Sequence, residues 1–130
     1  MASSGATPEE TPPRVLIIED EPLIVLDLTA ILKELGWNVC AVAGTAEDAI
    51  KAAARHTPDL ILADIRLPGP QDGIDAVKAI QAARRTPVLF VTGNWRELRA
   101  RGLPDAMAIG KPFLPSVLRQ AIRTVMNDGG

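Results

Sequence analysis

The fold is decided by residues 59–68, DLILADIRLP. The apolar run in this stretch reads as a short buried strand, and Asp64 follows at the end of that strand. An earlier run, Val15–Ile18, ends in the same way on two acids, Glu19 and Asp20. Because parallel neighbouring strands end at the same edge of a sheet, we expect these three carboxylates to lie together.

Strand-like and helix-like segments alternate along the chain. The predicted strands are Val15–Ile18, Val39–Val42, Leu60–Ala63, Val88–Val91 and Ala106–Ile109. The predicted helices are Pro22–Leu35, Ala46–Arg55, Gly73–Arg84, a weak stretch at Trp95–Arg101, and Ser116–Met126. Five strands separated by helices predict a doubly wound α/β fold, in which helices cover both faces of a parallel sheet.

Helix ends are marked by residues with known positional preferences. Pro22 suits a first helical position, and Gly36 suits the position after a helix. Thr45 and Asp72 are side chains of the type that caps the first turn of a helix.

Length and composition limit the classes of protein to consider. With 130 residues the chain is long enough for one domain. The segment 1–13 has no large apolar residue after Met1, so we predict a disordered tail there and a folded domain over 14–127.

Charge and cysteine usage narrow the cellular context. A net charge of −2 with scattered basic residues argues against nucleic-acid binding. Cys40 is the single cysteine, which predicts a reducing compartment and no disulfide within the chain. The apolar runs are too short for a membrane span and no signal pattern opens the chain, so a cytoplasmic location is expected by elimination.

Two further polar residues follow the last two predicted strands. Thr92 comes after the fourth strand, and Lys111 comes after the fifth. Clustered carboxylates repel one another, and a hard cation such as Mg²⁺ relieves that repulsion. The hydroxyl and the ammonium group are then suited to bind phosphate oxygens, and the carboxylate of Asp64 is suited to attack a phosphoryl group.

Each of these residues also has an ordinary structural interpretation. An acid after a strand often caps a helix or forms a turn, Thr92 before Gly93 suits a turn, and a single Lys is usually a surface charge. Their joint placement at the ends of the predicted strands favours the functional interpretation.

These motifs resemble the response-regulator receiver domain of two-component signalling, from about Arg14 to Met126. The matching stretches are Val15–Glu21, Asp59–Pro68, Asp72-Gly73, Val91–Gly93 and Lys111-Pro112-Phe113. The resemblance implies a flavodoxin-like sheet of order 2-1-3-4-5 and a cis peptide between Lys111 and Pro112.

The resemblance also implies a role for each site residue. Asp64 would be the phosphoacceptor, Thr92 the switch hydroxyl and Lys111 the phosphate-binding cation. Mg²⁺ would be held directly by Asp20, by Asp64 and by the backbone carbonyl of Arg66, with Glu19 acting through water.

The chain departs from the family pattern in the region of the fourth helix. Receivers often carry an aromatic switch residue three positions before the lysine, where this chain has Ala108, and Trp95 is the nearest aromatic alternative. Trp95 could equally be a packing residue in a loop. Only 19 positions separate Thr92 from Lys111, and Gly102 and Pro104 lie between them, so a short or irregular fourth helix is expected. The stretch Phe90–Gly93 is similar to that of a receiver subgroup with a Phe-Ala-Thr-Gly motif, whose members are often single-domain proteins.

We therefore expect a stand-alone receiver that is phosphorylated on Asp64 by a histidine kinase or a phosphotransfer protein and signals through an unidentified protein partner. A phosphate sink or relay station, and a pseudo-receiver that binds partners without phosphorylation, are the alternatives. A true phosphohydrolase is disfavoured because such enzymes commonly need a second acid two residues after the nucleophile, where this chain has Arg66.

Overall fold

The computed structural model describes residues 11–129, so most of the predicted tail lies outside the described residues. The strands are β1 (Arg14–Ile18), β2 (Asn38–Ala43), β3 (Leu60–Ala63), β4 (Val88–Val91) and β5 (Met107–Ile109). The helices are α1 (Pro22–Glu34), α2 (Ala46–His56), α3 (Gly73–Ala83), α4 (Glu97–Ala100) and α5 (Pro115–Gly129). The alternation expected from the sequence is confirmed, and α5 continues to Gly129, past the expected end at Met126.

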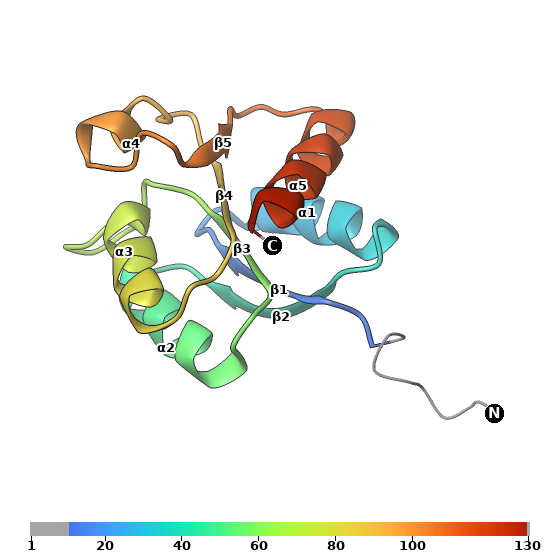
Figure 1. Ribbon diagram of the computed structural model, residues 1–130, viewed down its shortest axis with the longest axis horizontal. Coiled ribbons are helices and arrows are strands. Elements are labelled where there is room, and N and C mark those ends of the chain that lie inside the picture. The colour runs from blue at the N-terminus through green and yellow to red at the C-terminus, as the bar shows by residue number, and fades with distance from the viewer. Residues whose placement is uncertain (1–10, 130) are drawn as a thin grey trace.

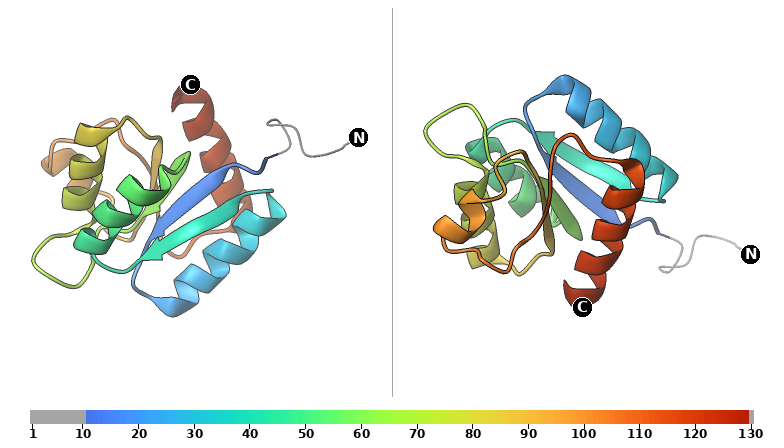
Figure 2. Two further views of the ribbon diagram at one scale, coloured as in Figure 1. Left: turned by 90° about the horizontal axis from the view of Figure 1, so that it is seen from below. Right: turned by 90° about the horizontal axis from the view of Figure 1, so that it is seen from above.

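The strands form one parallel sheet in the order β2-β1-β3-β4-β5, as expected. Figure 1 shows α1 and α5 on one face of the sheet and α2, α3 and α4 on the other, and Figure 2 shows the same two layers from its perpendicular views. β3 lies in the middle of the sheet, and its four residues are all buried. A strand that is covered on both faces has no solvent side, which explains its unbroken apolar run.

Two apolar clusters hold the layers to the sheet. Leu16 and Ile18 of β1 pack with α2 and α3, whereas Val15 and Ile17 pack with α1 and α5. Successive side chains of a strand point to opposite faces, so one short strand supplies both clusters.

Local signals set the helix ends as predicted. Pro22 opens α1, and Gly36 follows its end with φ of 88°. Thr45 accepts a hydrogen bond from the backbone N–H of Asp48, and Asp72 forms a reciprocal capping box with Asp75.

The fourth helix is short, as expected, and shorter than the predicted stretch Trp95–Arg101. α4 has four residues, and Gly102, with φ of 86°, lies just after it. Within residues 11–129, none of the helices combines the length and apolar character needed to cross a membrane.

Candidate functional site

Three carboxylates meet at the carboxyl edge of the sheet. The register pairs Ile18 of β1 with Ala63 of β3, so the residues that follow these strands are neighbours. One carboxylate oxygen from each of Glu19, Asp20 and Asp64 lies within 4.8 Å of the others. Glu19 and Asp64 are buried and Asp20 is exposed, so the cluster opens to solvent on one side.

Both carboxylate oxygens of Asp64 accept hydrogen bonds. Its Oδ1 accepts a hydrogen bond of 2.7 Å from the backbone N–H of Ile65, and its Oδ2 accepts one of 2.8 Å from Lys111. The backbone N–H of Asp64 donates to the carbonyl of Ile18 at 2.9 Å, which extends the β1–β3 ladder to the site. The carboxylate therefore has a defined orientation.

Lys111 is the counterion of the cluster. Its Nζ lies 2.6 Å from Oε1 of Glu19, 2.8 Å from Oδ2 of Asp64 and 3.3 Å from Oε1 of Glu21. Burial alone would lower the pKa of Lys111, but the hydrogen bonds to Asp64 and Glu19 outweigh burial and the pKa is raised. The ammonium group thus stays charged. The peptide bond between Lys111 and Pro112 is cis, as the resemblance implied.

Glu19 lies deeper than the other acids. Burial raises its pKa, and the bond from Lys111 and the backbone bond from Glu21 oppose that rise without cancelling it. Its Oε2 accepts the backbone N–H groups of Asp20 and Glu21, each at 3.1 Å. Glu19 therefore shapes the loop after β1 as well as contributing charge.

Thr92 reaches the same edge from β4. It is fully buried, its backbone N–H donates to the carbonyl of Ile109 at 3.0 Å, and its hydroxyl oxygen accepts the N–H of Asn94 at 3.1 Å. Because Oγ1 serves there as the acceptor, the hydroxyl proton is available to another group.

Gly73 packs directly against the backbone of Asp64. A Cβ at this position would lie 1.7 Å from the carbonyl oxygen of Asp64, so only glycine fits. Its N–H donates to the carbonyl of Ile65 at 2.8 Å. The Asp72-Gly73 motif was visible in the sequence, but the close approach that explains it was not.

Two arginines link this edge to the segment after β4. Arg66 contacts Glu97 of α4 at 2.8 Å, and Arg101 contacts Asp72 at 2.7 Å and Asp75 at 3.2 Å. The contacts of Arg101, and that between Glu21 and Lys111, were not foreseen from the sequence. Such pairs form where long side chains meet in the folded protein, and the spacing of residues in the sequence does not encode those meeting points.

The position three residues before Lys111, where receivers often carry an aromatic residue, holds Ala108. Trp95 is 50% exposed, with the guanidinium of Arg96 5.1 Å from its ring centroid. Trp95 and Ala108 line the same hollow, of about 450 Å³. Trp95 is thus half exposed, in the turn before α4, at a hollow that Ala108 also lines.

Fold and site together define a class, that of doubly wound α/β domains with an acidic, cation-balanced site at the carboxyl edge of the sheet. The family model described as response regulator receiver domain matches residues 15–123. The chain therefore belongs to the response regulator receiver family of two-component signalling, and the resemblance in the sequence is confirmed.

Relatives and solved structures agree with this assignment. The chain is 42% identical over 114 residues to the phyllosphere-induced regulator PhyR of Methylorubrum extorquens, covering 83% of this chain and 43% of that protein. It is 39% identical over 119 residues to the transcriptional regulatory protein PdtaR of Mycobacterium tuberculosis, covering 89% of this chain and 58% of that protein. The chain thus spans about half the length of these curated relatives.

A solved receiver domain has the same fold over nearly its whole length. The solution structure of the PhyR receiver domain of Erythrobacter litoralis matches with a TM-score of 0.83 and 36% identity, covering 92% of this chain and 93% of that domain.

Proposed function

We propose that this chain is a phosphoacceptor receiver in which Asp64 takes a phosphoryl group from a histidine kinase or a phosphotransfer protein, and that the new charge alters a protein-binding surface. The observation that carries the proposal is the orientation of Asp64. Its two carboxylate oxygens are held by a backbone N–H and by an ammonium group, within an acidic cluster that opens to solvent at Asp20.

The donor set fits Mg²⁺. Oxygens of Glu19, Asp20 and Asp64 are hard ligands that lie close enough to share one ion, and Mg²⁺ prefers a few carboxylates together with water and phosphate oxygens. In our proposal Asp20, Asp64 and the backbone carbonyl of Arg66 hold the ion directly, and Glu19 acts through water. When bound, Mg²⁺ supplies positive charge that offsets the negative charge of the phosphoryl oxygens.

The transfer step uses the side chains of this chain as nucleophile and charge partners. An oxygen of Asp64 attacks the phosphorus of a phosphohistidine, the P–O bond forms as the P–N bond breaks, and the electron pair of that bond leaves with the imidazole. The ammonium of Lys111, already 2.8 Å from Asp64, stabilises the charge on the transferred oxygens. The product is an aspartyl-phosphate.

The hydroxyl of Thr92 is the switch element of the proposal. It is buried at the end of β4, and the segment that follows leads directly into α4. Donation of its proton to a phosphoryl oxygen would move the loop at Gly93 and Asn94 and repack the region of α4 and β5.

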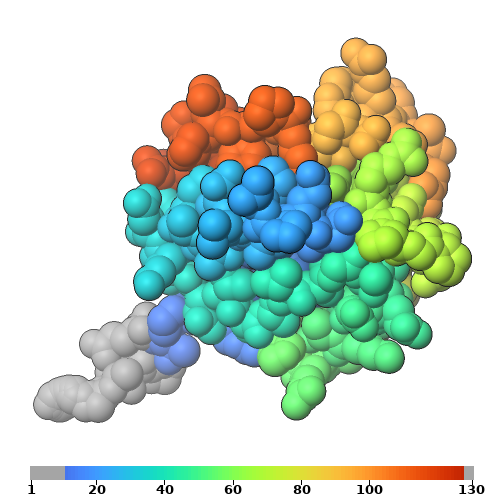
Figure 3. Space-filling view, turned by 180° about the vertical axis from the view of Figure 1, so that it is seen from behind, coloured from blue at the N-terminus to red at the C-terminus, as the bar shows by residue number. Residues whose placement is uncertain are grey.

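A surface for the phosphodonor lies beside the acidic cluster. Leu23 and Leu26 of α1 are 76% and 65% exposed, and Leu114 and Val117 near the start of α5 are also exposed. Figure 3 shows α1 and the segment leading into α5 on one face of the molecule. Exposed apolar groups of this kind mark an interaction site, and these four follow the elements that deliver Glu19 and Lys111.

A mass measurement tests the proposal. Incubation with a small phosphodonor and Mg²⁺ should add the mass of one phosphoryl group to the protein. Asp64→Ala should remove the adduct, whereas Asp59→Asn, at the opposite end of the same strand, should retain it. An adduct that survives Asp64→Ala, or no adduct with the unaltered chain, would refute the assignment.

A metal titration tests the ligand set separately. Calorimetry should show uptake of Mg²⁺ by the unphosphorylated protein, and Asp20→Ala should weaken it at least tenfold. Asp27→Ala, which removes an exposed acid of α1 outside the carboxylate cluster, should leave the affinity unchanged within about twofold. Uptake that is equal in the two variants would contradict the proposed ligands.

A further inference from the structure

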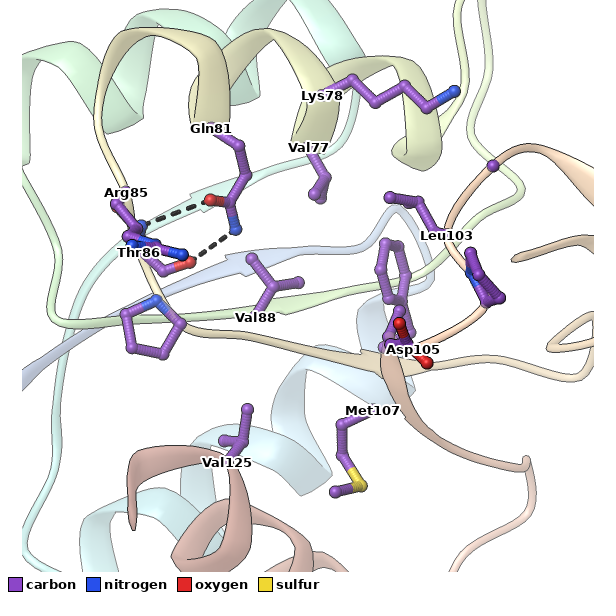
Figure 4. Close-up of a pocket in the computed structure, with 15 residues that line it drawn as sticks. Val77, Lys78, Gln81, Arg85, Thr86, Val88, Leu103, Asp105, Met107 and Val125 are labelled. Carbon is purple, nitrogen blue, oxygen red and sulfur yellow. Dashed lines mark hydrogen bonds between the residues drawn. The ribbon is translucent and has the colours of Figure 1, made fainter. Parts of the chain in front are cut away.

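A groove lies at the end of the sheet opposite the acidic cluster. It has a volume of about 740 Å³ and runs between α3, the first residues of β4 and the loop that precedes β5. In Figure 4, Val77 of α3 and Val88 of β4 face each other across it, and Leu103 borders it on the loop side. Met107 and Val125 lie at its lower end, so the lining is largely aliphatic.

The groove results from two short elements. β5 begins opposite Leu89, so the edge of β4 at Val88 has no strand beside it on that side. α4 ends at Ala100 after four residues, and only the loop 101–106 covers this part of the sheet. The side chains of Val88, Leu103 and Met107 are left half-buried there, and Val77 beneath them is buried.

The walls of the groove differ in charge. Lys78 of α3 and Arg85, just after α3, line one wall, and among the described residues neither pairs with a carboxylate. Nζ of Lys78 donates instead to the backbone carbonyl of Arg101 at 2.5 Å. The single acid in the lining, Asp105, stands on the opposite loop. The wall formed by α3 is therefore basic above an apolar floor.

This local charge belongs to a larger asymmetry. Residues 73–130 contain nine Lys and Arg and four Asp and Glu, whereas residues 1–72 contain five and twelve. The later segment builds α3, β4, α4, β5 and α5, and all of these except α4 contribute residues to the lining of the groove. Lys111 and Arg101 of this segment pair with carboxylates elsewhere, so the positive charge that a partner meets at the groove is that of Lys78 and Arg85.

We propose that this groove binds an acidic segment of a partner protein that carries aliphatic side chains along one face. The aliphatic side chains would lie on the half-buried Val88 and Leu103, and the carboxylates would lie toward Lys78 and Arg85. The apolar floor favours such a segment over a nucleic acid, whose backbone offers charge without aliphatic groups. Charge complementarity of this kind sets the orientation and association rate of a partner, and the apolar contact supplies affinity.

A synthetic peptide serves as the probe. It has roughly 14 residues, about four helical turns, with leucines at i, i+3, i+4 and i+7 and glutamates at the other positions. A matched peptide carries lysine in place of every glutamate. Amide chemical shifts of the full unphosphorylated chain are followed during titration, so the outcome does not depend on phosphorylation of Asp64.

Saturable changes in the amide chemical shifts of Val77, Val88 and Leu103 on addition of the acidic peptide would support the proposal. Lys78→Glu with Arg85→Glu should weaken its binding at least tenfold, while Lys33→Glu with Lys51→Glu, exposed bases on α1 and α2, should change it less than about twofold. Lys78→Gln with Arg85→Gln gives a milder pair if reversal disturbs the fold, and should still weaken binding severalfold.

Several results would overturn the proposal. These are equal binding of the lysine peptide, shifts that map away from the groove, and no saturable shifts at millimolar peptide. Tighter binding of a single-stranded oligonucleotide at the same residues would assign the groove to nucleic acid instead. Groove shifts that depend on protein concentration without peptide would assign it to self-association.

Discussion

Gly73 shows how closely the backbone is packed against Asp64. The carbonyl of Asp64 occupies the space where the side chain of any other residue would begin, and the N–H of Gly73 is bonded to Ile65. The start of α3 and the end of β3 are thus in direct contact.

Gly73→Ala should destabilise the fold by about 3 kcal/mol, because the new methyl group overlaps backbone atoms that cannot rotate away. Denaturant unfolding measures the change. Gly93→Ala, where a Cβ meets no atom within 4 Å, is the control and should fall within about 0.5 kcal/mol of the unaltered chain. Equal stabilities for the two variants would show that the backbone behind Asp64 can adjust.

Lys111 balances two buried carboxylates in the metal-free protein. Lys111→Met should lower the free energy of unfolding by ~2–4 kcal/mol in the presence of a chelator, because Glu19 and Asp64 lose their shared cation. Mg²⁺ should restore part of that stability, since an ion bound only by the folded state shifts the equilibrium toward it.

Lys51→Met, which removes an exposed lysine of α2, is the matched control for Lys111→Met. It should leave stability nearly unchanged with or without Mg²⁺. A Lys111→Met protein as stable as the control in chelator would mean that the carboxylates are neutralised in some other way.

At the scale of elements, α4 depends on contacts of the residues around it as well as on its own hydrogen bonds. Four residues are too few for an independently stable helix. Arg101, directly after α4, reaches the capping carboxylates Asp72 and Asp75 of α3, and Leu98 adds one buried side chain. The N-terminal cap of one helix therefore also anchors the next.

Arg101→Gln should make amide hydrogen exchange in the segment 97–106 severalfold faster and lower the melting temperature. Arg99→Gln, an exposed base of α4 that pairs with no carboxylate among the described residues, is the control. Equal exchange in the two variants would place the anchor elsewhere, with Leu98 as the first candidate.

The same contact carries a pH dependence. Burial raises the pKa of Asp72, but the hydrogen bonds from Arg101 and from the N–H of Asp75 outweigh burial and lower it below the usual value. A carboxyl with a lowered folded-state pKa stabilises the fold above its unfolded pKa of about 3.9, and that contribution is lost as the pH falls through the folded-state value. The difference in melting temperature between the unaltered chain and Arg101→Gln should be largest at neutral pH and should shrink below about pH 4.

The longer elements could be predicted because local signals agree with their tertiary setting. β3 is buried on both faces, so its sequence is apolar throughout, and α2 and α3 begin at capping residues that hold their first turns. α4 has no capping side chain at its start, and Gly102 and Pro104 predicted only that it would be short or irregular. The contacts of Arg101 with residues 26 and 29 positions away are encoded by no local pattern.

At the scale of the whole molecule, stability should be unevenly distributed. β1 and β3 lie at the centre of the sheet between two apolar clusters, whereas the segment from α4 to β5 lies at its edge over an open groove. Buried strands exchange their amides by global unfolding, and sparsely packed segments exchange through local opening.

Native-state hydrogen exchange should therefore separate these regions. Amides of β1 and β3 should follow the global free energy of unfolding as denaturant is added, and those of residues 97–106 should exchange with little dependence on denaturant. A common denaturant dependence throughout the chain would show that the edge opens only together with the centre.

The candidate site was predictable at this scale because topology gathers strand ends. Parallel strands in the order 2-1-3-4-5 bring Glu19, Asp64 and Thr92 to one edge, although they are far apart in the chain. The groove was not predictable, because it forms where β5 and α4 are too short to cover the sheet. A sequence records apolar residues without recording which of them stay uncovered.

The link between Arg66 and Glu97 has a consequence for timing. Arg66 stands two residues after the carboxylate that would carry the phosphoryl group, and Glu97 holds it from the segment that would report the signal. A partner protein that bound Glu97 would release the guanidinium of Arg66 from its ion pair. The freed guanidinium would alter the rate at which the acyl phosphate of Asp64 is hydrolysed. Because equilibrium coupling is reciprocal, a partner that binds the phosphorylated chain more tightly also favours phosphorylation of Asp64.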